Sequence, residues 1–325
     1  MFLSEDSHDT PRSAGQIVWD IVCAASLIGI WPRYVEPNLL TVSRVSIPIA
    51  NLPEDLRGLR IVHLSDLHLS SELPDAFLNK VVTASQAVKP DLIVFTGDFL
   101  CYGQPEGLAR LERFLKRFSA PLGCFAVLGN HDYEAYVGVN AKGEYDILPA
   151  SSAEIVKVFR RITHRQKVLG KFSKQLQDIE LQSVLTKFLK KTPFTLLENS
   201  SQKIAVGKTF LNICGLGEYS AGRCCPESAY RNYDRAYPGI ILAHNPDAVA
   251  QISAYPGDLV LCGHIHGGQI NLPWLVNRFT LVEHPEFRSG LFRLTDRLMY
   301  VSRGIGSVLR LRWRARPEVV VLTLT

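Results

Sequence analysis

The 325-residue sequence has few cysteines and no CxxC pair. Seven scattered cysteines are an odd number, which argues against a disulfide scaffold and against a thiolate zinc site. A reducing compartment is the simplest inference. With 46% hydrophobic and 21% charged residues, the composition also rules out a disordered or collagen-like chain. The net charge of +5 does not by itself indicate a nucleic-acid-binding protein.

The sequence also lacks an uninterrupted apolar run near its N-terminus that is as long as a bilayer span. Residues 17–31 are apolar apart from Asp20 and small residues, but a span needs about 20 residues. The segment has neither the basic region nor the small-residue cleavage site of a secretory signal. Two interpretations stay open: an interfacial or re-entrant anchor helix, and a helix packed in the core.

Short apolar runs and one helical pattern predict the fold class. Four residues between the second and third early runs share one helical face: Leu108, Leu111, Leu115 and Phe118. The runs predicted to be strands lie at 61–64, 92–96, 124–128, 210–214, 240–243, 259–262, 299–302 and 319–324. We therefore expect an α/β fold in which two packed sheets are flanked by helices.

Residues 157–191 depart from this pattern because they are strongly basic. They contain ten Lys or Arg and two acids, a net +8, so the rest of the chain sums to 5 − 8 = −3. Their apolar residues recur at helical spacing, at Leu169, Phe172, Leu176 and Ile179. The pattern predicts a basic amphipathic helical insertion at about 140–195. It is either a solvated helical hairpin on the body or a cap that contacts an anionic amphiphile or a membrane surface.

Side chains that ligate metals follow the predicted strands in five blocks. The blocks are HLSDLHLS (63–70), FTGDF (95–99), LGNHDY (128–133), AHNPD (243–247) and LCGHIHGGQ (261–269). Asp66 and His68 are two residues apart, so both point from one side of an extended strand end. Oxygen and imidazole donors without a thiolate suit Mn, Fe or Zn. A carboxylate that bridges two ions, with three or four donors on each side, describes a two-metal hydrolytic site.

These blocks resemble the calcineurin-like metallophosphoesterase family, in the order D-x-H, G-D, G-N-H, H and G-H-x-H. The resemblance implies a four-layer αββα sandwich of two mixed sheets flanked by helices, with two divalent cations, Mn²⁺ before Fe or Zn. By the family's pattern one metal is held by Asp66, His68, Asp98 and His266. The other is held by Asp98, Asn130, His244 and His264, so Asp98 is the bridge. His131 would act catalytically on the leaving oxygen or the phosphate oxygens, with Asp98 or another carboxylate as its partner.

Within the family, the blocks WPRYVEPN (31–38), LPEDLRGLRIVHLSDLH (52–68) and GHIHGGQ resemble a membrane-associated bacterial branch, especially the UDP-2,3-diacylglucosamine pyrophosphatases of lipid A synthesis. The resemblance implies a nucleotide-activated glycolipid substrate, cleaved at its diphosphate to UMP and 2,3-diacylglucosamine 1-phosphate. It also implies a peripheral location on the cytoplasmic face of a bacterial inner membrane. Asn130 and His131 would meet the phosphates. The apolar stripe of Leu169, Phe172 and Leu176 would shelter the acyl chains.

A second basic run near the C-terminus has no acid between residues 303 and 317. Its arginines alternate with apolar residues between 309 and 314, which predicts an edge strand or an interfacial loop. The run is either a solvated strand face or part of a membrane rim beside residues 17–31. Arg303 and Arg310 are the candidates for binding the substrate phosphates.

The predicted organisation is a membrane-proximal segment at 1–50 and a phosphoesterase domain at 51–325. No nucleic-acid partner is expected for the glycolipid hydrolase. Three rival functions stay open: a nuclease or cyclic-nucleotide phosphodiesterase whose basic segments bind nucleic acid, a phospholipid phosphatase, and a non-catalytic binding module.

Overall fold

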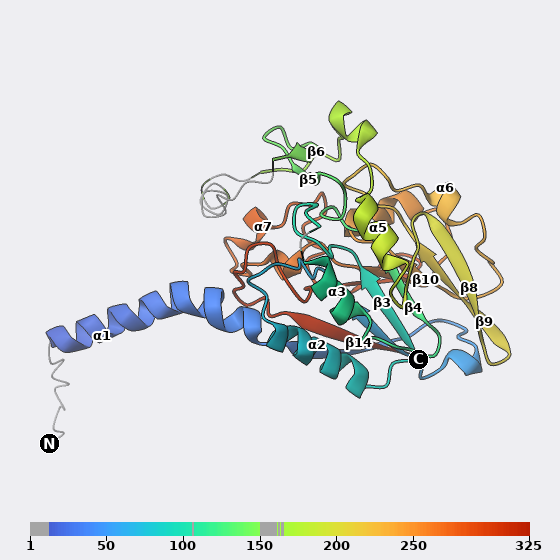
Figure 1. Ribbon diagram of the computed structural model, residues 1–325, viewed down its shortest axis with the longest axis horizontal. Coiled ribbons are helices and arrows are strands. Elements are labelled where there is room, and N and C mark those ends of the chain that lie inside the picture. The colour runs from blue at the N-terminus through green and yellow to red at the C-terminus, as the bar shows by residue number, and fades with distance from the viewer. Residues whose placement is uncertain (1–12, 106, 150–160, 162, 164–165) are drawn as a thin grey trace, which may run out of the picture.

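The computed structural model describes residues 13–105, 107–149, 161, 163 and 166–325, and two six-stranded sheets form its body (Figure 1). The first sheet has the order β1 (Thr41–Ile47), β14 (Glu318–Leu324), β2 (Arg60–Leu64), β3 (Leu92–Thr96), β4 (Cys124–Val127) and β7 (Phe194–Leu196). The second has the order β12 (Gly290–Arg293), β13 (Leu298–Val301), β11 (Leu259–Cys262), β10 (Gly239–Leu242), β9 (Thr209–Gly215) and β8 (Ser200–Val206). Both sheets are mixed, because β14–β2, β12–β13 and β8–β9 pair antiparallel while the other neighbours pair parallel.

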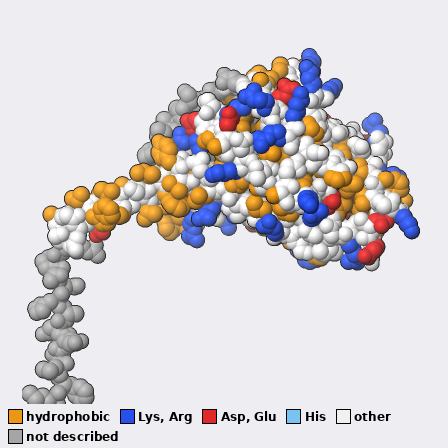
Figure 2. All heavy atoms as spheres, turned by 60° about the horizontal axis from the view of Figure 1, so that its bottom comes forward, with side chains coloured by type: hydrophobic (Ala, Val, Ile, Leu, Met, Phe, Trp, Pro, Cys, Tyr) orange, Lys and Arg blue, Asp and Glu red, His pale blue; other side chains and the backbone are white. Residues whose placement is uncertain are grey.

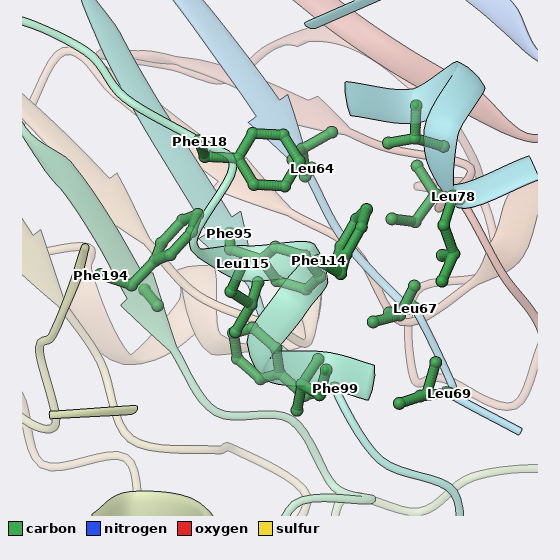
Figure 3. Close-up of a cluster of buried hydrophobic side chains, with 14 of the residues drawn as sticks. Leu64, Leu67, Leu69, Leu78, Phe95, Phe99, Phe114, Leu115, Phe118 and Phe194 are labelled. Carbon is green, nitrogen blue, oxygen red and sulfur yellow. The ribbon is translucent and has the colours of Figure 1, made fainter. Parts of the chain in front are cut away.

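Successive side chains of the strands point to opposite faces, and this alternation builds the layers. On the first sheet, Val62 packs toward the outer helices while Ile61 packs toward the second sheet. The outer helices are α2 (Asp75–Ala87), α3 (Leu108–Leu115) and α5 (Ser183–Leu189), whose apolar faces meet the sheet in an aromatic-rich cluster (Figure 3).

The second sheet is covered on its outer side by short elements. These are α6 (Pro226–Ala229) and the 3₁₀ segment Pro246–Ile252, whose Ala229 and Ile252 pack against its strands. The predicted α/β sandwich of two mixed sheets flanked by helices is thus confirmed. Another short helix, α7 (Val276–Phe279), follows an exposed loop.

The segment expected to be a helical insertion is only partly helical. A hairpin of β5 (Tyr136–Val139) and β6 (Tyr145–Leu148) spans its start at about residue 140, and a 3₁₀ turn at Lys174–Asp178 precedes α5. The predicted helix through Leu169 and Phe172 is wrong, because Tyr145 pairs with the chain there: its N–H donates to Lys171 O (2.8 Å) and its O accepts from Ser173 N–H (2.9 Å). Most of the basic stretch at 157–165 lies outside the described residues.

Residues 14–38 form one continuous helix that projects from the body (Figure 1). It comprises α1 (Ala14–Ala25), a π-helical part at Ser26–Val35 and a 3₁₀ turn at Glu36–Asn38. Ser13 caps its first turn reciprocally with Gln16. The helix is long and apolar enough, by length and composition, to cross a membrane, and α1 contains no buried residue. The alternative of a core-packed helix is therefore wrong, because its large apolar side chains face outward (Figure 2).

The predicted boundary at residue 50 is wrong, and one of two alternatives for the C-terminal basic run is decided. β1 lies within the segment 1–50 that was expected to be separate, and its seven residues pair with β14 in the first sheet. The C-terminal basic run at 303–316 is a loop rather than an edge strand. Its Arg312 is fully buried. The guanidinium is satisfied there because Nη1 donates to the carbonyls of Arg303 (2.6 Å) and Ala315 (2.9 Å).

Candidate metal centre

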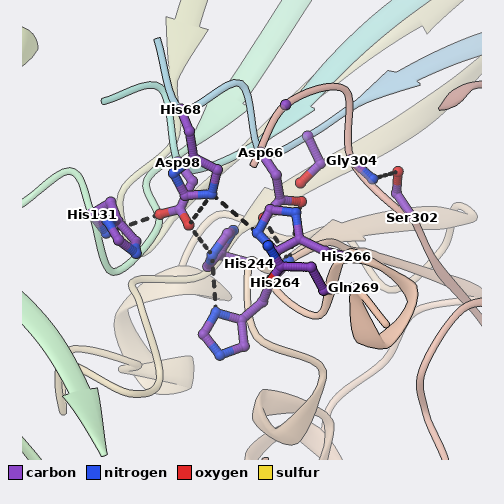
Figure 4. Close-up of polar contacts among 12 residues, drawn as sticks. Asp66, His68, Asp98, His131, His244, His264, His266, Gln269, Ser302 and Gly304 are labelled. Carbon is purple, nitrogen blue, oxygen red and sulfur yellow. Dashed lines mark hydrogen bonds and ion pairs between the residues drawn. The ribbon is translucent and has the colours of Figure 1, made fainter. Parts of the chain in front are cut away.

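The predicted metal ligands converge where strands of both sheets end (Figure 4). β2 leads to Asp66 and His68, β3 to Asp98, and β4 to Asn130 and His131. β10 leads to His244, and β11 to His264 and His266. Parallel strands bring their carboxyl ends to the same edge of a sheet, so loops from far apart in the sequence meet there.

Asp98 lies at the centre of the cluster. Its Oδ2 is 3.3 Å from His68 Nε2 and 3.1 Å from His244 Nε2, while Oδ1 accepts the backbone N–H of His131 (2.9 Å). One carboxylate oxygen is therefore fixed by the backbone, and the other lies between histidines of two different loops. This is the position expected of a bridging ligand.

The remaining donors form a group on each side of Asp98. In the first, His266 Nε2 lies 3.1 Å from His68 Nε2 and 3.6 Å from Asp66 Oδ1. In the second, Asn130 Oδ1 lies 2.9 Å from His264 Nδ1 and 3.2 Å from His244 Nε2. Ligand atoms within each of the sets Asp66–His68–His266 and Asp98–His244–His264 lie within 4.8 Å of one another.

The hydrogen bonds behind these rings show that the site fits cations. His244 Nδ1 lies 2.6 Å from the carbonyl of Thr96, which can only accept, so Nδ1 carries a proton, while Nε2 is directed at Asp98 Oδ2 and Asn130 Oδ1. Burial lowers the pKa of His244, but the nearby carboxylates, Asp98 first, raise it well above its usual value. Positive charge is thus stabilised at Nε2, where a cation can take the place of the proton. The residues therefore fit the divalent metal ions of a two-metal site.

Burial sets the protonation of most of the ring donors. It lowers the pKa of His68 to about 4 and that of His264 to about 3. Both imidazoles are therefore neutral at pH 7, the form that ligates metals. Burial also raises the pKa of Asp66 to about 6. For Asp98, burial favours the neutral acid, but the neighbouring imidazoles, His244 first, hold the pKa well below its usual range.

Five of the loop ligands have a backbone that L-residues rarely adopt. They have positive φ: Asp66 (54°), His68 (44°), Asp98 (59°), His264 (73°) and His266 (53°). Each such residue costs about 1–3 kcal/mol and persists only where the surroundings enforce it. The motif after β4 also needs a glycine, because a Cβ atom on Gly129 would lie 2.2 Å from Asp98 Oδ1 and would clash with it. The strain thus collects at the candidate site.

His131 is held differently from the other histidines. Its Nδ1 accepts the N–H of Tyr102 (3.0 Å), so the proton of the neutral ring is on Nε2. Burial is the main cause that keeps the pKa of His131 well below its usual value. The centre of its ring lies 4.5 Å from the centre of the Tyr136 ring. Its side-chain partner is therefore a backbone amide rather than a carboxylate. Asp98 instead contacts the backbone of His131.

A pocket opens over the cluster and has two chemically different parts. Its polar part includes Asp98, Asn130, His131, His264 and His266. Its apolar part is lined by Val137, Val139, Phe279, Leu281, Val282, Val308 and Leu309. Arg161, one of the arginines counted in the basic run, also lines the pocket. Sequence patterns could not have singled out Arg161 from its basic neighbours.

The other predicted substrate contacts lie outside this pocket. Phe172 and Leu176 line a second pocket with Tyr219 and Arg223, and Leu176 is only 3% exposed. Leu169 is exposed and lines neither pocket. The pocket at the metal cluster is thus lined by other apolar residues than those the sequence suggested.

Both predicted phosphate-binding arginines have protein partners. Arg303 pairs with Glu318 (Nη2–Oε2 2.6 Å). Arg310 donates to Asn38 Oδ1 (2.5 Å) and lines a small cleft beside His68. Neither arginine lines the pocket above the cluster.

Two residues that support the cluster were missed by the sequence analysis. Asp132 accepts the N–H groups of Leu100 and Gly129, both at 3.0 Å, and so ties together the loops after β3 and β4. Arg312 Nη2 lies 3.3 Å from His266 Nδ1. Asp132 could have been noticed because it directly follows His131 in the LGNHDY block, whereas Arg312 carries no such signal.

Comparisons with known proteins agree with this geometry. Residues 59–268 match the calcineurin-like phosphoesterase family, a span that includes all the converging donors. The chain is 39% identical over 315 residues to the UDP-2,3-diacylglucosamine pyrophosphatase LpxG of Chlamydia muridarum, covering 93% of this chain and 94% of that protein. The protein of the same name from Chlamydia trachomatis is 39% identical over 317 residues, with 93% and 94% covered. The phosphodiesterase YaeI of Escherichia coli is 28% identical over 292 residues, with 90% and 91% covered.

The family match and the buried donor groups support one another. The match extends over more than half of the chain, and the relatives align over nearly all of it. The family implies divalent metal ions, and the structure brings together the groups that could hold them. The protein therefore belongs to the calcineurin-like phosphoesterase family and is a metal-dependent hydrolase.

Proposed function

We propose that the protein hydrolyses the diphosphate of UDP-2,3-diacylglucosamine, releasing UMP and 2,3-diacylglucosamine 1-phosphate for lipid A synthesis. The observation that carries this proposal is the pocket, whose polar part holds the metal-ligating groups and whose remaining wall is apolar. A diphosphate attached to an acylated sugar needs both surfaces next to each other. The names of the relatives at 39% identity support the same substrate.

In the proposed site, Asp66, His68, Asp98 and His266 hold one divalent cation. Asp98, Asn130, His244 and His264 hold the other. Oxygen and imidazole donors favour Mn²⁺, with Fe or Zn as substitutes. When bound, the two cations lower the pKa of a water molecule and neutralise phosphoryl oxygens.

The chain's own residues then position the reacting groups and stabilise the charge that develops on them. Water forms a bond to one phosphorus and gives up a proton, while the bond from that phosphorus to the bridging oxygen breaks and the other phosphate leaves with the electron pair and takes up the proton. His131, whose neutral ring carries its proton on Nε2, donates a hydrogen bond to that leaving oxygen or to a phosphoryl oxygen without losing the proton. Arg161 offers positive charge to the diphosphate, and Leu281 and Leu309 belong to the wall that receives an acyl chain.

The proposed location is the cytoplasmic face of a bacterial inner membrane, with the helix Ala14–Asn38 as the attachment. The helix has the length and composition of a membrane-spanning segment. The sequence before it contains Glu5, Asp6 and Asp9 with one arginine, whereas Arg33 lies at its far end next to the arginines of the C-terminal loop. Basic residues favour the cytoplasmic side of a membrane, so the body would lie there.

The direct test is UMP release from UDP-2,3-diacylglucosamine in detergent with added Mn²⁺. Asp66→Ala serves as the blank. UMP release that requires Mn²⁺ and is absent in the variant would support the proposal. Hydrolysis of a short phosphodiester without UMP release would show that the protein is a phosphoesterase whose substrate is not the proposed glycolipid. That outcome would favour an activity like the one in the name of the Escherichia coli relative.

A further inference from the structure

The projecting helix is fixed to the body at its C-terminal end. The carbonyl of Pro32 accepts the N–H of Arg312 (2.8 Å), and Arg33 Nη1 donates to the carbonyl of Arg310 (3.1 Å). Glu36, only 3% exposed, accepts the N–H of Ala315 (2.7 Å). Three contacts to one loop hold the helix at a set angle, which a flexible linker would not do.

A second loop lies against the loop that holds the helix. Gln269 O accepts the N–H of Trp313 (2.9 Å), and Asn271 N–H donates to Trp313 O (2.8 Å). Gln269 Nε2 also donates to the carbonyl of Leu309 (2.7 Å). We name residues 269–275 and 305–316 together the helix-base surface. In Figure 1 these orange and red loops lie on the side of the body where the helix leaves it.

The helix-base surface carries a conspicuous apolar side chain. Trp274 is 74% exposed, more than any other large hydrophobic residue among those described. Arg314 and Arg316 are exposed on the same surface. An amphipathic aromatic ring with neighbouring arginines is the combination found at the level of lipid headgroups.

We propose that the helix-base surface lies against the phospholipid bilayer, with Trp274 inserted at the headgroup level, and that the pocket receives its lipid substrate directly from the membrane. This inference rests on the membrane attachment in the proposed function and adds the orientation of the body. At 1.5 Å per residue, the 25-residue helix is about 38 Å long, enough to cross the roughly 30 Å hydrocarbon layer. The fixed base then brings the adjoining loops to the membrane surface.

The same surface forms part of the pocket wall. Val308 and Leu309 belong to the loop that holds the helix and also line the pocket above the metal cluster. Phe279, another lining residue, ends α7 just beyond Trp274. An acyl chain entering along this wall would leave the bilayer without crossing water, which avoids the exposure cost of about 0.8 kcal/mol per CH₂.

The test measures how deeply individual tryptophans lie in vesicles of phosphatidylethanolamine and phosphatidylglycerol that contain brominated acyl chains. The protein's four tryptophans allow single-tryptophan variants. Trp19→Phe, Trp31→Phe and Trp313→Phe together leave Trp274 alone. A second variant keeps only Trp19, in the helix. The matched control replaces all four and carries Lys208→Trp, in the exposed β8–β9 turn at the opposite end of the body (Figure 1).

We expect lipids brominated near the headgroups to quench Trp274 and Trp19, since Trp19 lies about 29 Å along the helix from Asn38 and thus near the opposite headgroups. Brominated lipids should not quench Lys208→Trp. Quenching of Trp19 without Trp274 would overturn the inference while keeping the membrane attachment. No quenching of Trp19 would overturn both. Neither outcome depends on the substrate, so failure of the glycolipid assay is a separate result. Circular dichroism confirms that each variant is folded.

A second comparison tests whether the fixed base sets the orientation. Glu36→Ala, made in the background that keeps Trp274, removes the acceptor for Ala315 N–H. We expect it to lose quenching of Trp274, while Glu36→Gln retains an acceptor and the quenching. Unchanged quenching in Glu36→Ala would show that Glu36 does not orient the body.

Discussion

His131 allows a prediction that separates a hydrogen-bond donor to the substrate from a metal ligand. Its Nδ1 is occupied by the N–H of Tyr102, and burial keeps its pKa well below the usual value, so the ring is a neutral Nε2–H donor at pH 7. Removal of one preorganised donor to a developing oxyanion costs about 2.7–4 kcal/mol, which is a loss of about 10²–10³ in kcat. We expect His131→Ala to show this loss with both metal ions retained.

The assay pairs turnover with metal content. Hydrolysis of aryl phosphodiesters with leaving groups of different pKa is measured with Mn²⁺, and bound Mn²⁺ is counted after gel filtration. A loss that grows as the leaving group becomes more basic would place the His131 hydrogen bond on the leaving oxygen, where more negative charge then develops. A uniform loss would place the donor on a phosphoryl oxygen. The reasoning would be refuted if His131→Ala bound less metal, since the ring also lies within metal-ligand distance of His68 and Asp98.

Three further predictions concern the ligands, the pocket wall and stability. His264→Ala should abolish turnover and bind one Mn²⁺ fewer, with an unchanged circular dichroism spectrum, because it removes a donor from only one group; substantial residual turnover would contradict its assignment. Leu309→Asp should weaken binding of the diacylated substrate by about ten- to a hundredfold, since burial of a leucine contributes about 1.5–3 kcal/mol. KM for a short phosphodiester should stay unchanged, and an equal loss on both substrates would show a structural role. Burial is the larger cause, and the nearby Glu218 carboxylate the smaller one, that raises the pKa of Glu198 to about 8. The folded state therefore keeps a proton that the unfolded state releases near pH 4.5. This contribution to stability is complete below pH 4.5 and is lost as the pH rises to about 8. Glu198→Gln should thus gain about 1–3 kcal/mol over the unmodified protein between pH 5 and 8 in urea unfolding, and a parallel pH dependence of the two proteins would disprove this.

The sequence predicted the layers and the convergence of the donor groups because both depend on short patterns. Apolar runs such as residues 61–64 form strands, and the parallel strands bring the following loops to one edge. The resemblance then named the side chains that meet there. Their distances agree with two groups that share Asp98, while their roles in binding metal stay predictions that the variants above test.

The sequence failed where contacts between distant segments decide the structure. The apolar spacing at 169–179 suits a helix, but Tyr145 holds the chain extended, and Gly170 has a φ of +63°. Tertiary contacts override helix propensity in such segments. Arg312 was expected at the surface, yet it is enclosed by carbonyls of its own loop, which no residue pattern encodes.

The apolar N-terminal segment shows a different kind of failure. The apolar stretch at 17–31 has fifteen residues and is interrupted by Asp20, which predicts a segment too short for a bilayer span. The helix nevertheless continues to Asn38, and its π-helical part accommodates Pro32, which has no N–H to donate. The helical segment is therefore longer than the apolar run in the sequence.

The position of β14 has a consequence for the order in which the protein matures. This strand lies between β1 and β2, so the first sheet cannot close until residues 318–324 have left the ribosome. The preceding loop also completes the surroundings of Asp66, because Gly306 N–H donates to the Asp66 carbonyl (2.7 Å). The N-terminal helix is synthesised first. During translation the nascent chain thus exposes its apolar helix long before it has an intact candidate metal centre, and it cannot hydrolyse its substrate before synthesis is nearly finished.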